Sequence, residues 1–467
     1  MMKWANDMNS QALHTYMVNT EAGQVSPFLG SIDDFQRLAI QGRFGDNVPQ
    51  IGEVEFISGG SPCQGFSGMT NDKKAPKQMK NQSLVAAFAS CVDVYRPKYG
   101  ILENVAGIIK KRRNRDQDVF SQLMCALVGM GYQARVFLLD AVSCGSCQLR
   151  PRVFIIFAAP GWTLPETPVQ THSQHSNVKN MGLGRLPTGE PMVQRQLAKC
   201  TPFTYKTAAQ MTADLPDLYD AKPDICIPFP DHRVLSGTNT KLVRSRVRLI
   251  PRFPYGMNFS QAWYGLYGTS PRAAGRGVLT GSERTTFWPS DNDEAMVTAI
   301  HSNSYGRQYP DQPMPTVLTG AGPGDAKQGR TIHWAEDRCM SIMEAKRAQG
   351  FLDEEVLLGK SATQYKIIGN SVAREVSLAL GAVTKEAVMR SYRDICKKLP
   401  VGKDQEGDQE EDQEDIIESS PFWEVPAIRD SEPDTPETSV RTSPGAPPPP
   451  PPRTRKEDGT HKRRRVD

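Results

Sequence analysis

Residues 53–67 of this 467-residue chain read EVEFISGGSPCQGFS, and this stretch decides the fold. The run EVEFIS at 53–58 predicts a short buried strand, because its apolar residues stop abruptly at a Gly-Gly-Ser-Pro loop. Residues 81–95 then carry apolar side chains at helical spacing, and Tyr99–Leu102 predict a second strand. A strand, a loop, a helix and a strand in this order predict an α/β domain with a mainly parallel sheet.

The same alternation continues on the C-terminal side. A helix is expected over 118–130, followed by strands over 133–139 and 152–158. Helical patterning returns at 339–350 and 370–398, where Ala, Leu and Val positions form one apolar face. The α/β domain is therefore expected to close with C-terminal helices.

Composition divides the chain into four parts. We expect a catalytic domain over 1–160 and an irregular mixed domain over 161–330, where periodicity gives way to Pro, Gly, Thr and Arg. Residues 331–400 are expected to return to the first domain. Residues 401–467 are acidic, then rich in Ser, Thr and Pro, a composition that predicts disorder.

Charge is distributed unevenly along the chain. The net charge is +4, but residues 401–467 hold 10 Lys and Arg against 17 Asp and Glu, so residues 1–400 carry about +11. A basic body suggests a polyanionic partner such as nucleic acid, although excess Lys and Arg is also ordinary solvated surface. The cluster Lys462–Val466 is of the nuclear-import type, which favours a nuclear location.

Two classes of protein are excluded. No window approaches the roughly 18 uncharged apolar residues of a membrane span, so we expect no membrane partner. Nine cysteines, an odd number scattered through a large chain, indicate reduced thiols rather than a disulfide framework.

Candidate chemistry falls at the ends of the two predicted strands. Cys63 and Glu103 each follow a strand, and ligands of open α/β sheets bind at such carboxyl ends. A cysteine on a glycine-rich loop is a candidate nucleophile, and Arg150 and Arg152 could lower its pKa. Glu103 could donate a proton or a hydrogen bond. Alone, Cys63 would more simply be a small buried residue in a turn.

The four segments PCQGFS, ENV, QLRPR and GNSV, in this order and spacing, resemble the motifs of cytosine-C5 DNA methyltransferases. The likeness covers roughly residues 1–160 and 305–395. Within the family, GGSPCQGFS and the segment from 80 to 105 look closest to fungal enzymes of the RIP-defective type. The resemblance implies a DNA (cytosine-5-)-methyltransferase with a Rossmann-like fold, acting on double-stranded DNA in the nucleus, in epigenetic silencing of repeats.

The resemblance also implies roles for the catalytic residues. Cys63 would add to carbon 6 of cytosine, and Glu103 would hold the ring nitrogen N3 and the amino group. Arg150 and Arg152 would hold the base oxygen and the loop of the thiolate, and Gln148 would orient that pocket. The target base would have to leave the duplex to be reached.

The implied cofactor is S-adenosyl-L-methionine. Asp7 would place its carboxylate on the ribose hydroxyls, although as a residue it could equally be a solvated helix-capping acid. The other residues expected against the cofactor are Met8, Ile32, Leu84, Asn370, Ser371 and Val372.

The sequence departs from the family pattern at three points. Family members begin with a strand and a glycine-rich turn of FxGxG type, and nothing of this kind precedes WANDM at 4–8. We therefore expect a sheet that lacks its first strand. Ser31 stands where the family usually has an Asp, and Cys147 replaces a Pro. Cys144 and Cys147 form a single CxxC pair, which offers too few ligands for zinc, so we expect no metal.

The irregular segment 161–330 occupies the place of the family's target-recognition domain. Its densest positive stretch is suited to phosphates and guanine edges, and comprises Arg244, Arg246, Arg248, Arg252, Arg272 and Arg276.

Two other functions of the whole protein remain open. One is a tRNA cytosine-C5 methyltransferase, and the other is a truncated or inactive relative that only binds nucleic acid.

Overall fold

The structure is a computed structural model. It describes residues 2–43, 47–62, 65–66, 74–109, 118–175, 178, 181–195, 198–218, 228–234, 241–264, 303–319 and 329–398. Cys63, Arg272, Arg276 and the tail 401–467 lie outside the described residues, so the predicted disorder and import signal of the tail stay predictions. Residues 1–400 form one compact unit, and the boundaries expected at 160 and 330 stay predictions as well.

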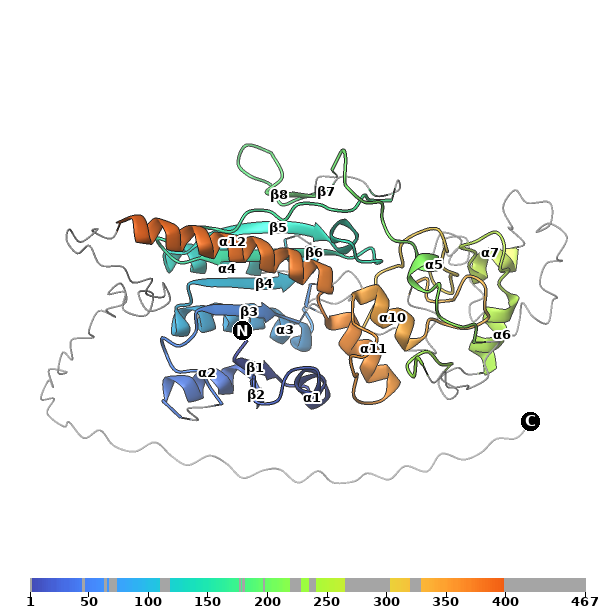
Figure 1. Cartoon of the computed structure of the whole chain (residues 1–467), viewed down its shortest axis with the longest axis horizontal. Helices are drawn as coiled ribbons and strands as arrows, with labels where there is room; N and C mark the ends of the chain where they lie inside the picture. Colours follow the sequence, from blue (N-terminus) through green and yellow to red (C-terminus); the bar gives the residue numbers. More distant parts are fainter. Residues whose placement is uncertain are drawn as a thin grey trace, which may run out of the picture. The chain divides into compact units, whose positions relative to one another are not determined.

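In the described residues the strands form three sheets, of which two, made by β1 to β6, carry the residues of the candidate site (Figure 1). β1 (Trp4–Asp7) and β2 (Ser26–Leu29) make a parallel pair. The larger sheet has the order β3-β4-β6-β5. Its strands are β3 (Phe56–Gly60), β4 (Tyr99–Asn104), β5 (Gln133–Asp140) and β6 (Pro151–Ala158). β3 and β4 are parallel, and only β6 runs antiparallel to both of its neighbours. The α/β class with a mainly parallel sheet is confirmed.

The sheet is interrupted between β1 and β3. In the part of the chain that the structure describes, β1 pairs only with β2, and β3 pairs only with β4. Both pieces nevertheless contribute to one apolar cluster, in which Trp4 and Phe28 of the small sheet and Ile57 of β3 pack with Phe35 and Tyr95. One edge of β1 and one edge of β3 therefore lack a strand partner within a shared core.

Helices cover both faces of the larger sheet (Figure 1). The N-terminal helices are α1 (Ser10–Val18), α2 (Ile32–Ile40), α3 (Pro76–Tyr95) and α4 (Val119–Gly129). α3 and α4 pack on one face, and α12 (Arg374–Lys398) packs against β5 and β6 on the other. β6 is the most buried strand, as its apolar sequence PRVFIIFA requires of a strand covered on both faces.

Local sequence explains how α3 meets the sheet. Pro76 occupies the first turn of α3, where its missing N–H costs no hydrogen bond. Gly59 of β3 lies beneath Phe88 of α3, and a Cβ on this glycine would come within 2.6 Å of the Phe88 ring. The glycine therefore lets α3 lie close against the strand that leads into the Cys63 loop.

The remaining elements lie directly after β4, directly after β5, and from the irregular segment onward. They are η2 (Ala106–Ile108), η3 (Ala141–Cys144), the hairpin β7 (Met181–Leu183) and β8 (Val193–Arg195), α5 (Ala208–Met211), α6 (Lys241–Leu249), α7 (Phe259–Tyr264), α10 (Ile342–Gln349) and α11 (Ser361–Asn370). α10 and α11 lie beyond the carboxyl ends of β4 and β5 (Figure 1).

Three expected boundaries were wrong. The first strand spans Phe56–Gly60 rather than 53–58, so it includes the glycines expected in the loop. The second strand, expected over Tyr99–Leu102, continues to Asn104, so Glu103 lies within the strand rather than after it. The helix expected over 370–398 is preceded by α11, which ends at Asn370, and α12 begins only at Arg374. The GNSV segment is therefore a turn between two helices rather than the start of one.

Candidate active site

The loop that carries Cys63 is attached to the segment after β4 on both sides of the cysteine. Before it, the buried Asn104 side chain donates a hydrogen bond to the Ser61 hydroxyl at 2.9 Å. After it, the buried Phe66 lies against Gly107, where a Cβ would come within 2.2 Å of the Phe66 carbonyl oxygen. Ser61 and Phe66 are therefore both attached to the segment that follows Glu103, while Cys63 itself lies outside the described residues.

Glu103 lies at the carboxyl end of β4, in register with Gly60 of β3. Its side chain is mostly buried and pairs with Arg152, whose Nε lies 3.0 Å from the Glu103 carboxylate oxygen Oε1. Burial raises the pKa of Glu103 above its usual value, and the nearby positive charges of Arg152 and Arg150 oppose this shift. A buried carboxyl group of this kind can carry a proton to an acceptor.

Arg150 and Arg152 have different hydrogen-bond partners, although only one residue separates them. Its guanidinium donates hydrogen bonds to the carbonyl oxygens of Gly369 at 2.7 Å, Ser371 at 3.0 Å and Val317 at 3.2 Å. The side chain is only 3% exposed. In this structure Arg150 holds the GNSV turn, whereas Arg152 holds Glu103. A direct role of either arginine toward the base stays a prediction.

Gln148 is fully buried and belongs to the same network. Its side-chain oxygen accepts from the Val317 N–H at 2.8 Å, and its amide donates to the Ala348 carbonyl and to Gln349. The Gln349 amide in turn donates to the Ser371 carbonyl. Gln349 therefore connects QLRPR with GNSV. Sequence reasoning missed it, because a glutamine at the end of a helix gives no signal of its own.

Asp140 is a second buried residue that the sequence did not single out. One of its carboxylate oxygens accepts from the Arg150 backbone N–H at 2.9 Å, and the other pairs with Arg195 at 3.0 Å. Burial raises the pKa of Asp140, and its hydrogen bonds and Arg195 oppose that shift. Through Asp140, the hairpin β7–β8 is attached to β5, at the start of the loop that leads to Gln148.

The residues predicted for the cofactor lie on several elements. Asp7 and Met8 lie at the exposed carboxyl end of β1, and Met8 is 71% exposed. The Asp7 carboxylate accepts a hydrogen bond from the Asn9 backbone N–H at 2.7 Å, whereas the Asn9 side chain is the N-cap of α1. Ile32 begins α2 and packs on the cluster shared by the two sheets, and Leu84 is half-buried on α3.

The other three predicted cofactor residues lie at the end of α11 and directly after it. Asn370 is exposed, whereas Ser371 and Val372 are half-buried. The Ser371 carbonyl accepts from both Arg150 and Gln349, and the Ser371 hydroxyl donates to Ile367 at 2.8 Å. The turn is therefore held by Arg150 and Gln349. Contact of any of the seven predicted residues with a cofactor stays a prediction.

Ser31 caps α2 instead of presenting an acid. Its hydroxyl accepts from the Asp34 N–H at 3.0 Å and donates to the Asp34 carboxylate at 2.7 Å. Arg37 also pairs with Asp34, and these contacts lower the pKa of Asp34. Asp34 is thus engaged in capping its own helix.

The arginines of the irregular segment divide into two groups. Arg244 and Arg248 are exposed on α6. Arg246 is 5% exposed and donates to the Tyr305 hydroxyl at 2.9 Å, so the expectation that it meets phosphates was wrong. Arg252 pairs with Asp337 at 2.7 Å. Burial and pairing therefore leave α6 with two outward arginines.

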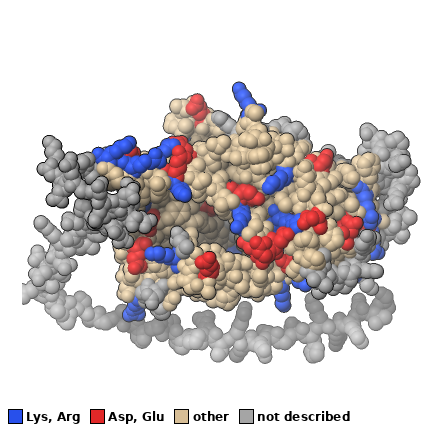
Figure 2. Space-filling view, in the orientation of Figure 1, with Lys and Arg blue, Asp and Glu red and all other residues tan. Residues whose placement is uncertain are grey.

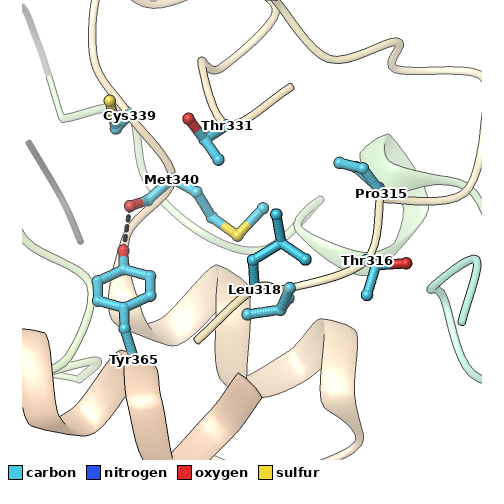
Figure 3. Close-up of a pocket in the computed structure, with 8 residues that line it drawn as sticks. Pro315, Thr316, Leu318, Thr331, Cys339, Met340 and Tyr365 are labelled. Carbon is cyan, nitrogen blue, oxygen red and sulfur yellow. Dashed lines mark hydrogen bonds between the residues drawn. The ribbon is translucent and has the colours of Figure 1, made fainter. Parts of the chain in front are cut away.

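A small apolar pocket lies between the irregular segment and α11 (Figure 3). Its lining includes Leu318, Met340 and Tyr365, and the Tyr365 hydroxyl donates to the Met340 carbonyl. It contains none of the residues predicted for catalysis or for the cofactor. We therefore assign the pocket to packing.

Of the two CxxC cysteines, Cys147 is buried and Cys144 is half-buried. The Cys147 thiol is 0% exposed and donates to the Lys206 carbonyl at 3.4 Å. Burial raises the pKa of Cys144 and of Cys147 to about 11, which favours the protonated thiol. In the described residues no group of three His, Cys, Asp or Glu side chains could hold a metal ion.

Comparison with known proteins assigns the chain to a family. Residues 2–386 match the family model of the C-5 cytosine-specific DNA methylases, and the chain belongs to this family. It is 27% identical to the DNA (cytosine-5)-methyltransferase PliMCI of Paracentrotus lividus, over 86% of this chain and 27% of the relative. It is 28% identical to DNA (cytosine-5)-methyltransferase 1 of Mus musculus, over 86% of this chain and 28% of the relative.

A plant relative shows the same relation. The chain is 31% identical to DNA (cytosine-5)-methyltransferase 1A of Oryza sativa subsp. japonica, over 73% of this chain and 22% of that protein. The chain thus spans about a quarter of the length of these relatives.

Within the described residues, no helix has both the length and the apolar character needed to cross a membrane.

Proposed function

We propose that the chain is a DNA (cytosine-5-)-methyltransferase that uses Cys63 as nucleophile and Glu103 as its acid partner. One observation carries this proposal. Ser61 and Phe66, on either side of Cys63, are both attached to the segment that follows Glu103, through Asn104 and Gly107. A thiol and a buried carboxyl group held at the ends of two adjacent strands fit attack on a base and protonation of its ring.

The proposed steps follow from these groups. The Cys63 thiolate adds to carbon 6 of a flipped cytosine, while Glu103 gives a proton or hydrogen bond to N3 as electron density moves toward carbon 5. Carbon 5 would then take a methyl group from a sulfonium donor, which would leave as a neutral thioether. Loss of the carbon 5 proton to solvent, expulsion of the thiolate and return of the N3 proton to Glu103 restore the aromatic ring and release the enzyme. Arg152 keeps the Glu103 carboxyl oriented through its 3.0 Å contact.

The exposed end of the small sheet fits the proposed cofactor. Ligands of open α/β sheets bind outside the carboxyl ends of strands, where Asp7 and Met8 lie. An exposed carboxylate suits ribose hydroxyls, and Ile32, Leu84 and Val372 offer apolar surface. S-Adenosyl-L-methionine would supply an electrophilic methyl group on a sulfonium. Asp7 and the 370–372 turn would hold it from two sides.

The proposal extends to the setting of the reaction. Double-stranded DNA is the proposed substrate, and the basic cluster at 462–466 supports a nuclear location. GGSPCQGFS and residues 80–105 support a placement near the fungal RIP-defective enzymes, with a role in epigenetic silencing of repeats.

The interrupted sheet favours a second candidate function. Between β1 and β3, both edges are open in the described residues, and Phe56 of β3 is 38% exposed. A sheet that is interrupted at this place would bind the proposed cofactor weakly, and a chain with such a sheet would act as a nucleic-acid-binding protein.

Calorimetric titration with S-adenosyl-L-methionine separates the two candidates. We expect weak or no binding to the 467-residue chain, and micromolar binding to a version with a family strand and glycine turn added before Met1. Methyl transfer by the extended version to duplex DNA rather than to tRNA would support the main proposal. Low-micromolar binding by the 467-residue chain would show that the sheet needs no further strand. An extended version that binds cofactor yet transfers no methyl group would favour the binding-only function.

A further inference from the structure

The hairpin β7–β8 contacts two segments of the candidate active site. Its second strand, β8, lies against β5 (Figure 1). At the end of β8, the Arg195 guanidinium Nη1 lies 3.0 Å from a carboxylate oxygen of Asp140, the last residue of β5. Directly after β7, Gly184 lies beside Ile109, and a Cβ on this glycine would come within 3.3 Å of the Ile109 side chain. Ile109 belongs to the segment that follows Glu103. The hairpin therefore connects that segment with the end of β5.

Asp140 closes the loop that carries Gln148 and Arg150. It ends β5 directly before this loop, which comprises residues 141–150. Its carboxylate accepts a hydrogen bond from the Arg150 backbone N–H at 2.9 Å, at the end of the loop. It also accepts a hydrogen bond from the Val142 backbone N–H, at the start of the loop. One carboxylate therefore holds both ends of the loop and the arginine of the hairpin.

Apolar side chains hold the hairpin against the segment that contains η2. Leu183 of β7 and Val193 of β8 are cross-strand partners. Both are buried in one apolar cluster with Ile108 and Ile109. Burial of side chains of this size stabilises a contact that needs no charge. The hairpin is thus anchored on η2 independently of its ion pair with Asp140.

The ion pair of Asp140 and Arg195 is shielded from water. Lys, Arg, Asp and Glu side chains are visible on the molecular surface in Figure 2, whereas the side chains of Arg195 and Asp140 are only 10% and 2% exposed. Removal of either partner would leave a buried charge without its counter-charge, which is strongly unfavourable. The pair therefore keeps the end of β5 at a fixed position relative to the hairpin.

We propose that Arg195 is a positioning residue of the candidate active site, which fixes the loop 141–150 relative to the segment after Glu103 through its ion pair with Asp140. The reaction that is positioned in this way is that of the proposed function, on which the inference rests. Groups that are held within about 1 Å of their productive arrangement react roughly 100-fold faster than misplaced ones. A hairpin that carries none of the residues assigned to the chemistry would thus control its rate.

The double variant Asp140→Asn/Arg195→Met tests the link without leaving a buried charge. The asparagine oxygen can still accept the Arg150 N–H, so the loop keeps this bond and loses its ion pair with the hairpin. Arg195→Lys is the conservative variant, because an ammonium can still pair with the carboxylate. The matched control is Arg135→Met/Glu166→Gln. It removes another ion pair of β5, in which the side chains are 37% and 63% exposed.

Hydrogen exchange of the full chain, followed by mass spectrometry, measures the positioning without any reaction. In the double variant, residues 141–150 should exchange about tenfold faster than in the original chain. Residues 105–109 should exchange at the original rate, because the apolar contacts of the hairpin are kept. Arg195→Lys and the control on β5 should leave the exchange of 141–150 unchanged.

Adduct formation measures the effect on the site. The probe is a DNA duplex with 2-pyrimidinone, a base that accepts a thiolate without methyl transfer. At saturating duplex, the rate constant of the double variant should be roughly 10- to 100-fold lower, with an unchanged half-saturating concentration of duplex. Arg195→Lys should stay within about threefold of the original rate constant, because the contact involves a single guanidinium nitrogen. A pair that serves only stability would lower the melting temperature and leave this rate constant unchanged.

An unchanged exchange of residues 141–150 in the double variant would overturn the proposal. An unchanged rate constant at saturating duplex, or an equal loss of rate in the control on β5, would overturn it as well. If the original chain forms no adduct, the proposed function fails. Hydrogen exchange then decides alone whether Arg195 positions the loop, so the two failures are distinguishable.

Discussion

Substitution of Arg150 by lysine should destabilise the protein strongly, whereas the same substitution at Arg152 should not. The Arg150 guanidinium makes three hydrogen bonds to carbonyl oxygens from a site that is 3% exposed. A lysine ammonium at this position could keep about one of them. Hydrogen bonds to charged groups contribute about 1.5–3 kcal/mol each, and a buried carbonyl oxygen that is left without a partner adds a further cost. We therefore expect a loss of about 3–5 kcal/mol in the free energy of unfolding.

The assay is urea unfolding of the full chain, followed by tryptophan fluorescence, with Arg152→Lys as the matched control. Arg152 pairs only with Glu103 and with the carbonyl of Pro151 among the contacts described, and its side chain is 15% exposed. Its lysine variant should lose no more than about 1 kcal/mol, because an ammonium can still pair with the carboxylate. A loss below about 1 kcal/mol for Arg150→Lys would refute the assignment of Arg150 to the GNSV turn.

Three further predictions concern buried polar groups. Gln349→Leu removes the link between Gln148 and the turn at Ser371, and should lower the free energy of unfolding by about 1–2 kcal/mol in the same urea assay. The loss is moderate because Gln148 and the Ser371 carbonyl each keep another hydrogen bond. An unchanged free energy of unfolding would contradict the link. Burial raises the pKa of Glu103, so the protonated carboxyl group stabilises the fold at and below pH 4.5, and this stability is lost as the pH rises above that value. Glu103→Gln should therefore reduce the fall of the melting temperature as the pH rises above 4.5, and an equally steep fall in the variant would count against the shift. Burial lowers the pKa of His333 to about 4, so the free energy of unfolding should be about 3 kcal/mol lower near pH 4 than above pH 6.5. His333→Gln should remove this difference in urea titrations at acid pH, and a difference that persists in the variant would contradict the shift.

Much of the central fold could be predicted from the sequence. The apolar run of β6 and the helical spacing in α3 and α4 are local signals, and each element formed where these signals lie. The boundary of β3 could not be predicted, because glycines read as a loop unless one knows that Phe88 packs above Gly59. The start of α12 was missed for a similar reason, since the turn before it is held by Arg150 from a distant part of the chain.

The candidate site was only partly accessible to sequence reasoning. Glu103 and Arg152 could be named, because they follow or begin strands whose ends meet at one edge of the sheet. Side chains two residues apart point to the same side only within a regular strand. Arg152 lies in β6 but Arg150 precedes it, so the sequence pattern could not predict that the two arginines have different partners. Gln349 and Asp140 carry no motif, so only their buried partners identify them.

Covalent trapping of Cys63 on a modified base tests the central claim most directly. Duplex DNA with 2-pyrimidinone at the target position accepts a thiolate at carbon 6 without needing a methyl donor, so the reaction does not depend on cofactor binding. We expect a DNA–protein adduct that survives denaturing electrophoresis for the 467-residue chain, and none for Cys63→Ser. An adduct that persists in the serine variant, or no adduct from the original chain although it binds the duplex, would show that Cys63 is not the nucleophile.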